Sequence, residues 1–166
     1  GAGDALYAGF ADYYLPETAW PALIDHLADS GEISTVAGQA APIAPLADLD
    51  LSAFAGADMA EIIARLAEQG NEAMLKPIRR NSPLSMAAGL RLVREARGDA
   101  RMQDSLAREY RFTSRATRAS DFLEGVRAQI IDKDRNPQWR ADASPAHVAA
   151  MLASLGHGEI TWEDAK

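Results

Sequence analysis

Apolar residues recur at intervals of three and four positions along most of the chain, which is the spacing of an amphipathic helix. Valine is scarce, and no stretch alternates β-branched and polar residues in the way that is typical of a half-buried strand. The clearest periodic stretch is 58–70, where Ile62, Ile63 and Leu66 repeat at the helical interval. The pattern therefore predicts an all-α protein.

Capping residues set the expected ends of these helices. Asp58 precedes the stretch 58–70, Glu61 follows three residues later as its capping-box partner, and Gly70 closes it. Ser82 and Pro83 open the next long helix as its cap and its first helical residue. A helical turn is expected from Asp4, and the next helix over 17–31 with Thr18 as its cap. Further helices are expected over 71–81 with an internal Pro77, 100–118, 121–132 and 144–156.

Each predicted helix has one face that is expected to pack on a core, and Trp139 is expected to anchor the chain after Pro137 has ended the helix before it. Gly125 is expected to permit the close approach of a neighbouring element. The expected core positions are Ala22, Leu23 and Leu27; Met86, Leu90 and Val93; Met102, Leu106, Tyr110 and Thr113; and Phe122, Val126 and Ile130.

Length and composition limit the kinds of protein this chain can be. Its 166 residues suit one domain with a core of its own, although residues 37–50, with two prolines and no helical pattern, are expected to form a loop. The absence of cysteine excludes disulfides, thiol nucleophiles and thiolate zinc sites. No apolar run approaches the roughly 18 residues that cross a bilayer, and the first residues lack the pattern of a signal peptide. A soluble protein of the cytoplasm is expected, and the excess of arginine over lysine suggests a bacterial source.

Charge is distributed unevenly along the chain. The net charge is −7, yet residues 76–140 carry 15 basic and 8 acidic residues. One face of a predicted helix carries a row of four arginines, Arg108, Arg111, Arg115 and Arg118. This row is expected to be a solvated helix face, to form salt bridges to the acidic first half of the chain, or to bind phosphate. Nucleic acid is not favoured as a partner, because aromatic residues do not alternate with the arginines and the protein is acidic overall.

The sequence does not support several common kinds of catalytic or metal site. The three histidines lie in separate segments without a partner at metal-binding spacing, and no serine has the glycines of a nucleophile elbow around it. Asp132, Asp134 and Asn136 match the first, third and fifth positions of a calcium loop. That loop needs glycine where Pro137 stands and glutamate where Ala143 stands. We therefore predict no metal site and no catalytic residue in this chain.

Four short motifs follow one another in the second half of the chain. They are Ser-Pro-x-Ser at 82–85, Glu-Tyr-Arg at 109–111, Asp-Phe-x-Glu-Gly-Val-Arg-Ala at 121–128 and Asp-Lys-Asp-x-x-Pro-x-Trp at 132–139. With these motifs the sequence resembles the C-terminal part of the 3-hydroxyisobutyryl-CoA hydrolase family, a branch of the enoyl-CoA hydratase/isomerase (crotonase) superfamily. The resemblance covers essentially residues 1–155.

The resemblance implies a helical C-terminal portion whose catalytic core is absent. Residues 1–16 would leave that core, residues 17–57 would form a helix and a proline-containing strap, and residues 58–166 would form a C-terminal helical domain. In the family a ββα superhelical core carries the chemistry, with an oxyanion hole of backbone N–H groups and two catalytic carboxylates. The chain has no Gly-Gly pair and does not begin with methionine, so we expect that core to be missing.

The resemblance also implies a substrate and partners. The parent enzyme would hydrolyse small β-hydroxyacyl-CoA thioesters in valine breakdown, with acyl-CoA as substrate and no separate cofactor, and this chain alone would be inactive. Arg127, Lys133 and Arg135 are expected to reach CoA phosphates. The missing core and further copies of the chain are the expected partners, and a membrane is not. Two other interpretations remain open: a family member of different specificity, and a stand-alone helical interaction module.

Overall fold

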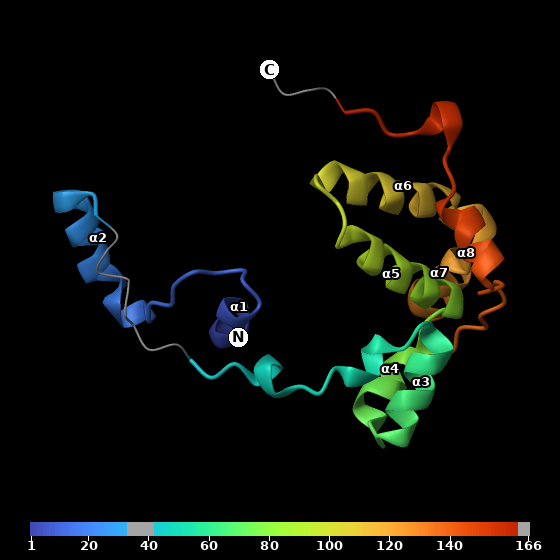
Figure 1. Ribbon diagram of the computed structural model, residues 1–166, viewed down its shortest axis with the longest axis horizontal. Helices are drawn as coiled ribbons and strands as arrows, with labels where there is room; N and C mark the ends of the chain where they lie inside the picture. The colour runs from blue at the N-terminus through green and yellow to red at the C-terminus, as the bar shows by residue number, and fades with distance from the viewer. Residues whose placement is uncertain (33–41, 163–166) are drawn as a thin grey trace. The chain divides into compact units, whose positions relative to one another are not determined.

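The computed structural model describes residues 1–32 and 42–162, which form helices and short helical turns (Figure 1). These residues contain no strand, which confirms the all-α prediction. The same residues include no helix that is long and apolar enough to cross a membrane. The chain divides into two compact units, Gly1–Ser52 and Ala53–Lys166. The boundaries of the three predicted segments stay predictions, and residues 37–41 of the predicted loop lie outside the described residues.

The first unit is built from short helices. Asp4 of its first helix accepts a hydrogen bond from the backbone N–H of Leu46 at 2.9 Å. Gly3 lies so close to residues 42–43 that an added Cβ atom would lie 2.2 Å from the carbonyl oxygen of Ile43, so only glycine fits there. The elements of this unit are α1 (Ala2–Tyr7), the 3-10 turn η1 (Glu17–Ala19), α2 (Trp20–Ser30) and the 3-10 turn η3 (Pro45–Asp48).

Helix α2 differs from the prediction at its start and on its apolar face. Thr18 does not cap it, because the turn η1 runs directly into the helix and Ala19 takes the N-cap position. Gly31 ends the helix in the left-handed conformation, as predicted, with φ 71°. No residue of α2 is buried, so Leu23 and Leu27 do not form a core in this unit.

The second unit packs its helices around two apolar cores. Helices α3 and α4 lie side by side, and α5, α6 and α8 pack against one another (Figure 1). The elements are η4 (Ser52–Ala55), α3 (Met59–Glu68), α4 (Glu72–Arg80), α5 (Pro83–Ala96), α6 (Met102–Ala119), α7 (Phe122–Val126), the π-helical turn η5 (Arg127–Ile131), α8 (Pro145–Leu152) and η6 (Gly156–Gly158). One core consists of Ala53, Ile62, Leu66 and Leu75, and the other of Leu84, Ala88, Val148, Met151 and Leu152.

The caps of α3 and α5 are those predicted. Asp58 accepts a hydrogen bond from the backbone N–H of Glu61 at 2.9 Å, and the Ser82 hydroxyl accepts one from Ser85 at 3.3 Å. The Glu61 carboxylate reaches back to the N–H of Ala57 at 2.6 Å, one residue before the expected partner. Local sequence signals therefore determine where these two helices begin.

The predicted core face of α6 is wrong, and that of α5 holds only in part, because Leu90 packs against the core of Ala53, Ile62, Leu66 and Leu75. Val93 is 62% exposed and Met102 is 76% exposed, whereas Leu84 and Ala88 of α5 are buried against α8. In α6 the buried residue is Ala116. The small side chains of Ala88 and Ala116 allow close approach of neighbouring helices at these positions.

The helix that begins at Phe122 also buries a different face from the predicted one. Phe122 is 53% exposed and Ile130 is 65% exposed, whereas Ala128 is fully buried. Pro137 does not end this helix, because its last turn η5 stops at Ile131 and a loop of different geometry begins there.

Candidate functional site

A cluster of charged groups around Arg127 joins α7 to the loop that follows η5. The guanidinium donates hydrogen bonds to Glu124 at 2.9 and 2.8 Å. It also donates to Asp132 at 2.6 Å, to Asp134 at 2.7 Å and to the carbonyl oxygen of Asn136 at 3.2 Å. We call these five residues the Arg127 cluster. Because three carboxylates surround one guanidinium, the loop is held against the helix.

The charges of the Arg127 cluster stabilise one another. Hydrogen bonds from Arg127, and then from the backbone N–H of Gln138, lower the pKa of Glu124 to about 2. Arg127 is also the main cause of the lowered pKa of Asp134. In return, these carboxylates raise the pKa of Arg127 above its already high value. Glu124, Asp134 and Arg127 are therefore charged at neutral pH.

The loop held by the Arg127 cluster has an unusual backbone. Lys133 has φ 57° and Arg135 has φ 54°, and in the described part of the chain no other residue except glycine has a positive φ. The backbone N–H of Arg135 donates to the carbonyl oxygen of Ala128 at 3.0 Å, which ties the loop to η5. A left-handed residue other than glycine costs roughly 1–2 kcal/mol, so this conformation persists because its surroundings impose it.

The three residues predicted to reach CoA phosphates lie together in this region but differ in their surroundings. Lys133 and Arg135 are exposed. Arg127 is half-buried, and its donors are directed to carboxylates. Asp132 and Asp134, the residues that resemble a calcium loop, bind this guanidinium, so their charge is already compensated. The binding of CoA phosphates by the three basic residues stays a prediction.

A second polar network centres on Asp121, which the sequence did not identify as important. This buried carboxylate accepts hydrogen bonds from the Ser82 hydroxyl at 2.9 Å and from the backbone N–H groups of Arg140 at 2.8 Å and Ala141 at 2.9 Å. Asp121 occupies the N-cap position of α7, but its side chain makes no hydrogen bond to that helix. It therefore joins three segments that are far apart in the sequence. The one available signal was its place at the start of the motif at 121–128.

A polar pocket of about 460 Å³ lies beside both networks. Its lining includes one carboxylate from each network, those of Asp121 and Glu124, and the guanidinium of Arg127. Its walls are formed by Ser120, Asp121, Glu124, Arg127, Gln138 and Arg140. With charged and hydrogen-bonding groups on its walls, this pocket suits a polar ligand rather than an apolar one.

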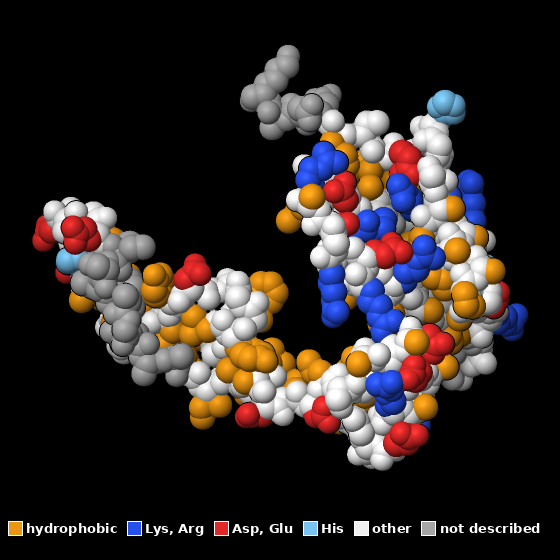
Figure 2. Space-filling model, viewed as in Figure 1, with side chains coloured by type: hydrophobic (Ala, Val, Ile, Leu, Met, Phe, Trp, Pro, Cys, Tyr) orange, Lys and Arg blue, Asp and Glu red, His pale blue; other side chains and the backbone are white. Residues whose placement is uncertain are grey.

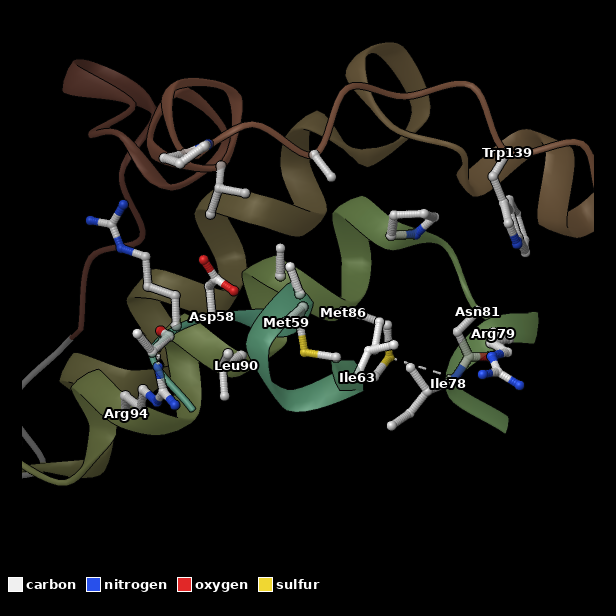
Figure 3. Close-up of a pocket in the computed structure, with 18 of the residues that line it drawn as sticks. Asp58, Met59, Ile63, Ile78, Arg79, Asn81, Met86, Leu90, Arg94 and Trp139 are labelled. Atoms are coloured by element: carbon white, nitrogen blue, oxygen red, sulfur yellow. Dashed lines mark hydrogen bonds between the residues drawn. The ribbon is translucent and has the colours of Figure 1, made fainter. Parts of the chain in front are cut away.

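A larger, mainly apolar groove of about 700 Å³ lies elsewhere in the second unit (Figure 3). Met59 and Ile63 come from α3, Ile78 comes from α4, and Met86 and Leu90 come from α5. Figure 3 shows these side chains together in the middle of the view, with Arg94 and Trp139 toward opposite ends. The groove can receive apolar groups of a ligand or of another polypeptide segment.

Trp139 lines the groove and also connects it to the loop of the Arg127 cluster. Its indole N–H donates to the carbonyl oxygen of Arg80 at 3.0 Å, which confirms the predicted anchor. An added Cβ atom on Gly125 would lie 3.6 Å from the indole ring, which is an ordinary van der Waals distance. Glycine is therefore not sterically required at this position, contrary to the prediction.

The row of arginines on α6 is used mainly inside the unit. Arg108 forms ion pairs with acidic residues at and after the end of α5, and Arg111 donates to Glu159 at 2.9 Å. Arg115 donates to backbone carbonyl oxygens at and after the end of α8. Figure 2 shows basic and acidic side chains interleaved over α5 and α6. Arg108 and Arg111 therefore form salt bridges, but their acidic partners lie in the second unit and not in the acidic first half of the chain as predicted.

Both units expose large apolar side chains. In the first unit they include Tyr7, Phe10, Trp20 and Ile24, and in the second they include Phe122, Leu123, Ile130 and Ile131. The surface of each unit is therefore suited to contacts with other polypeptide segments.

Among the described residues, no group of three or more histidine, aspartate or glutamate side chains is placed to hold a metal ion.

Comparison with known proteins gives a consistent set of relatives. The family model described as enoyl-CoA hydratase/isomerase matches residues 1–154. The mitochondrial 3-hydroxyisobutyryl-CoA hydrolase of Gallus gallus is 38% identical over 116 residues, which cover 66% of this chain and 30% of the relative. The human protein of the same name is 38% identical over 92 residues, covering 54% of this chain and 24% of the relative. The chain thus spans about a third or less of the length of these curated relatives.

Two solved structures have a similar fold over 98% of this chain and 50% of their own. The crystal structure of an enoyl-CoA hydratase from Rhodobacter sphaeroides 2.4.1 is 44% identical with a TM-score of 0.79. The crystal structure of a carnitinyl-CoA dehydratase from Mycobacterium thermoresistibile is 29% identical with a TM-score of 0.78. The helices described above therefore correspond to about half of each solved chain.

Proposed function

Because the chain belongs to the enoyl-CoA hydratase/isomerase family, we propose that it is the helical C-terminal part of a hydrolase of 3-hydroxyisobutyryl-CoA. The agreement of the curated relatives, which are named as hydrolases of this thioester, carries the proposal. In such a reaction water adds to the thioester carbonyl, the C–S bond breaks, and the products are 3-hydroxyisobutyrate and the free thiol of CoA. This substrate would place the enzyme in valine breakdown.

In this proposal the chain supplies no catalytic residue. The described residues contain no strand, and the resemblance attributes the oxyanion hole and the reactive carboxylates to a strand-containing core. The reactive groups would therefore belong to the remaining half of a longer protein. The described helices would position the substrate and cover that core.

We assign the apolar groove and the exposed apolar side chains to contacts with the rest of the enzyme. The groove is lined by side chains such as Met59, Ile63 and Leu90, which an exposed surface of a monomeric protein rarely gathers in one place. Without its catalytic half, the chain would use these surfaces to self-associate. Light scattering of residues 1–166 should show oligomers whose population rises with concentration, and a monomer at all concentrations would count against this role.

We assign the loop 132–138 to the phosphate groups of CoA. Lys133 and Arg135 are exposed cations on one short loop, and Arg127 organises that loop. Acyl-CoA is a substrate in this proposal, and no further cofactor is required. The cytoplasm stays the predicted compartment, although several relatives are named as mitochondrial.

The direct experiment expresses the complete reading frame that encodes this chain and measures the release of free CoA thiol from 3-hydroxyisobutyryl-CoA. The proposal expects turnover of this thioester by the complete protein. A complete protein that binds the thioester but releases no thiol would contradict the hydrolase assignment.

A hydratase is the second candidate, because the solved structure with 44% identity is named as an enoyl-CoA hydratase. The same preparation should then convert an enoyl-CoA to a 3-hydroxyacyl-CoA, seen as loss of the enoyl absorbance, without releasing thiol. Neither activity in the complete protein would favour the stand-alone helical interaction module instead.

A further inference from the structure

Arg94 of α5 binds the backbone close to the point where the second unit begins. We propose that this arginine pins residues 54–57 to α5, so that the chain between the two units bends before Ala53 and not after it. We call residues 54–57 the pinned segment. This role of Arg94 does not depend on the hydrolase assignment.

A single guanidinium holds three carbonyl oxygens of the pinned segment. Arg94 donates hydrogen bonds to Ala57 at 2.5 Å, to Phe54 at 3.4 Å and also to Gly56. Hydrogen bonds from a charged donor are stronger than those between neutral groups, and the planar fork of arginine can serve several acceptors at once. Because all three acceptors are main-chain atoms, this contact fixes the path of the backbone itself.

Helix α3 also holds the pinned segment. The Glu61 carboxylate accepts a hydrogen bond from the backbone N–H of Ala57 at 2.6 Å. Gly56 passes so close to the start of α3 that an added Cβ atom would lie 3.0 Å from the backbone nitrogen of Ile62. Two helices therefore grip the same four residues, and the close packing leaves the backbone little room to change direction there.

The residues just before the pinned segment are exposed. Leu49 and Leu51 lie between the turns η3 and η4, outside either turn. Ala53 is fully buried in the core beside Ile62, but its side chain is a single methyl group, which anchors the chain weakly. A bend after Ala53 would draw this residue out of the core. The contact of Arg94 with the pinned segment opposes such a bend and confines it to the exposed residues.

The pinned segment also borders the apolar groove, whose lining includes Ala57, Asp58 and Arg94. Figure 3 shows Arg94 toward one end of the groove. A bend within the segment would displace Ala57 and Asp58 and change that end of the groove. With the bend confined to residues before Ala53, the groove keeps its shape when the first unit moves.

The first experiment locates the bend by limited proteolysis of residues 1–166 with elastase, which cleaves after small residues such as alanine. Ala47 precedes the pinned segment, whereas Ala55 and Ala57 lie within it and are exposed, so burial of their side chains does not protect them. In the wild type we expect cleavage after Ala47 and little cleavage within the segment. In Arg94→Met, cleavage after Ala55 and Ala57 should become about tenfold faster, because the open form of the segment is more populated.

Two further variants serve as controls. Arg91 lies one turn earlier on α5 and lines the same groove, but it pairs with Glu95 at 2.7 Å and not with the backbone. Arg91→Met should therefore leave the cleavage pattern unchanged. Arg94→Lys keeps the charge but offers one nitrogen in place of the fork, so its cleavage within the segment should be about threefold faster than in the wild type.

Hydrogen exchange measures the same opening without a protease. The Gly56 N–H donates to the carbonyl oxygen of Ala53 at 3.1 Å, and we expect this amide to exchange about tenfold faster in Arg94→Met. The amide of Leu66, a core residue of α3, should keep its exchange rate, which would show that the unit stays folded.

Equal cleavage and exchange in Arg94→Met and the wild type would overturn the role of Arg94, and so would equal effects of Arg91→Met. Wild-type cleavage within the pinned segment as fast as after Ala47 would show that the bend is not confined. If Arg94→Met also speeds exchange of Leu66, Arg94→Lys decides, because wild-type exchange of Gly56 in that variant would contradict the need for the fork. These measurements use no substrate, so their outcome is separate from that of the thiol-release experiment.

Discussion

The two compact units of this chain contrast in how much they bury. In the described residues of Gly1–Ser52 only Gly3 is buried, whereas Ala53–Lys166 buries two apolar clusters and the carboxylate of Asp121. Both units contain amphipathic helices, and α2 has apolar residues at helical spacing just as α3 does. Helical periodicity alone therefore does not tell whether an apolar face is buried within the same unit.

The contrast has consequences for stability. Full burial of a leucine or isoleucine side chain contributes roughly 1.5–3 kcal/mol, and only the second unit has such residues. The first unit also contains no lysine or arginine that could form ion pairs with its acidic residues. We infer that the second unit is the stable part of the chain, and the proposal that the first unit packs on a missing core fits its exposed apolar residues.

The largest expected effect comes from a matched pair of isoleucines. Ile62→Ala in the core of the second unit should lower the free energy of unfolding by about 2–4 kcal/mol, because it leaves a cavity beside Leu66 and Leu75. Ile24→Ala in α2, where the side chain is 63% exposed, should lower it by less than about 0.5 kcal/mol. Urea unfolding followed by circular dichroism gives both values, and equal effects would remove the contrast.

A smaller effect is expected from the buried carboxylate of the second unit. Asp121→Ala should lower the free energy of unfolding by about 2–3 kcal/mol, because it leaves the N–H groups of Arg140 and Ala141 and the Ser82 hydroxyl without their acceptor. Asp29→Ala, at an exposed position of α2, is the control and should stay within about 0.5 kcal/mol of the wild type. The same unfolding measurement applies, and an Asp121→Ala variant as stable as the control would show that the network is not structural.

The smallest of the three expected effects is that of acid on the loop held by the Arg127 cluster. The pKa of Glu124 is about 2 in the folded chain against an ordinary value of 4.5, so the carboxylate favours the folded loop above pH 4.5. This contribution should be lost as the pH falls from about 4.5 to about 2. The Gln138 N–H donates a hydrogen bond to Glu124 at 2.6 Å. We expect the protection of this N–H against hydrogen exchange to fall over this pH range.

Glu124→Gln provides the control for the acid effect. This variant cannot ionise at position 124, so the protection of the Gln138 N–H should already be reduced at pH 7 and should change less between pH 4.5 and pH 2. Hydrogen exchange read by NMR measures both proteins. If the wild type and the variant follow the same pH profile, the carboxylate of Glu124 does not control the loop.

Sequence reasoning succeeded where one helix carries its own signals. Asp58 and Ser82 cap helices through backbone N–H groups three residues away, so their roles depend on neighbours that the sequence makes visible. The same rules predicted Thr18 as the cap of α2, and this was wrong, because Thr18 lies inside the 3-10 turn that precedes the helix.

Sequence reasoning failed where distant segments decide the outcome. The buried face of α5 is chosen by its contact with α8, so Ala88 is buried and the larger Val93 is exposed. Asp121 bonds to groups about twenty and forty residues away, and no local pattern indicates those partners. Arg127 was predicted to reach CoA phosphates, but the carboxylates that surround it become apparent only when the loop after η5 folds back on α7.

The proposed function divides the protein into a helical part that positions the substrate and a reactive part elsewhere in the protein. The most direct measurement compares thiol release from 3-hydroxyisobutyryl-CoA by residues 1–166 and by the protein of the complete reading frame at equal molar concentration. We expect turnover by the complete protein and none above buffer by residues 1–166. Turnover by residues 1–166 alone, or none by the complete protein, would contradict it.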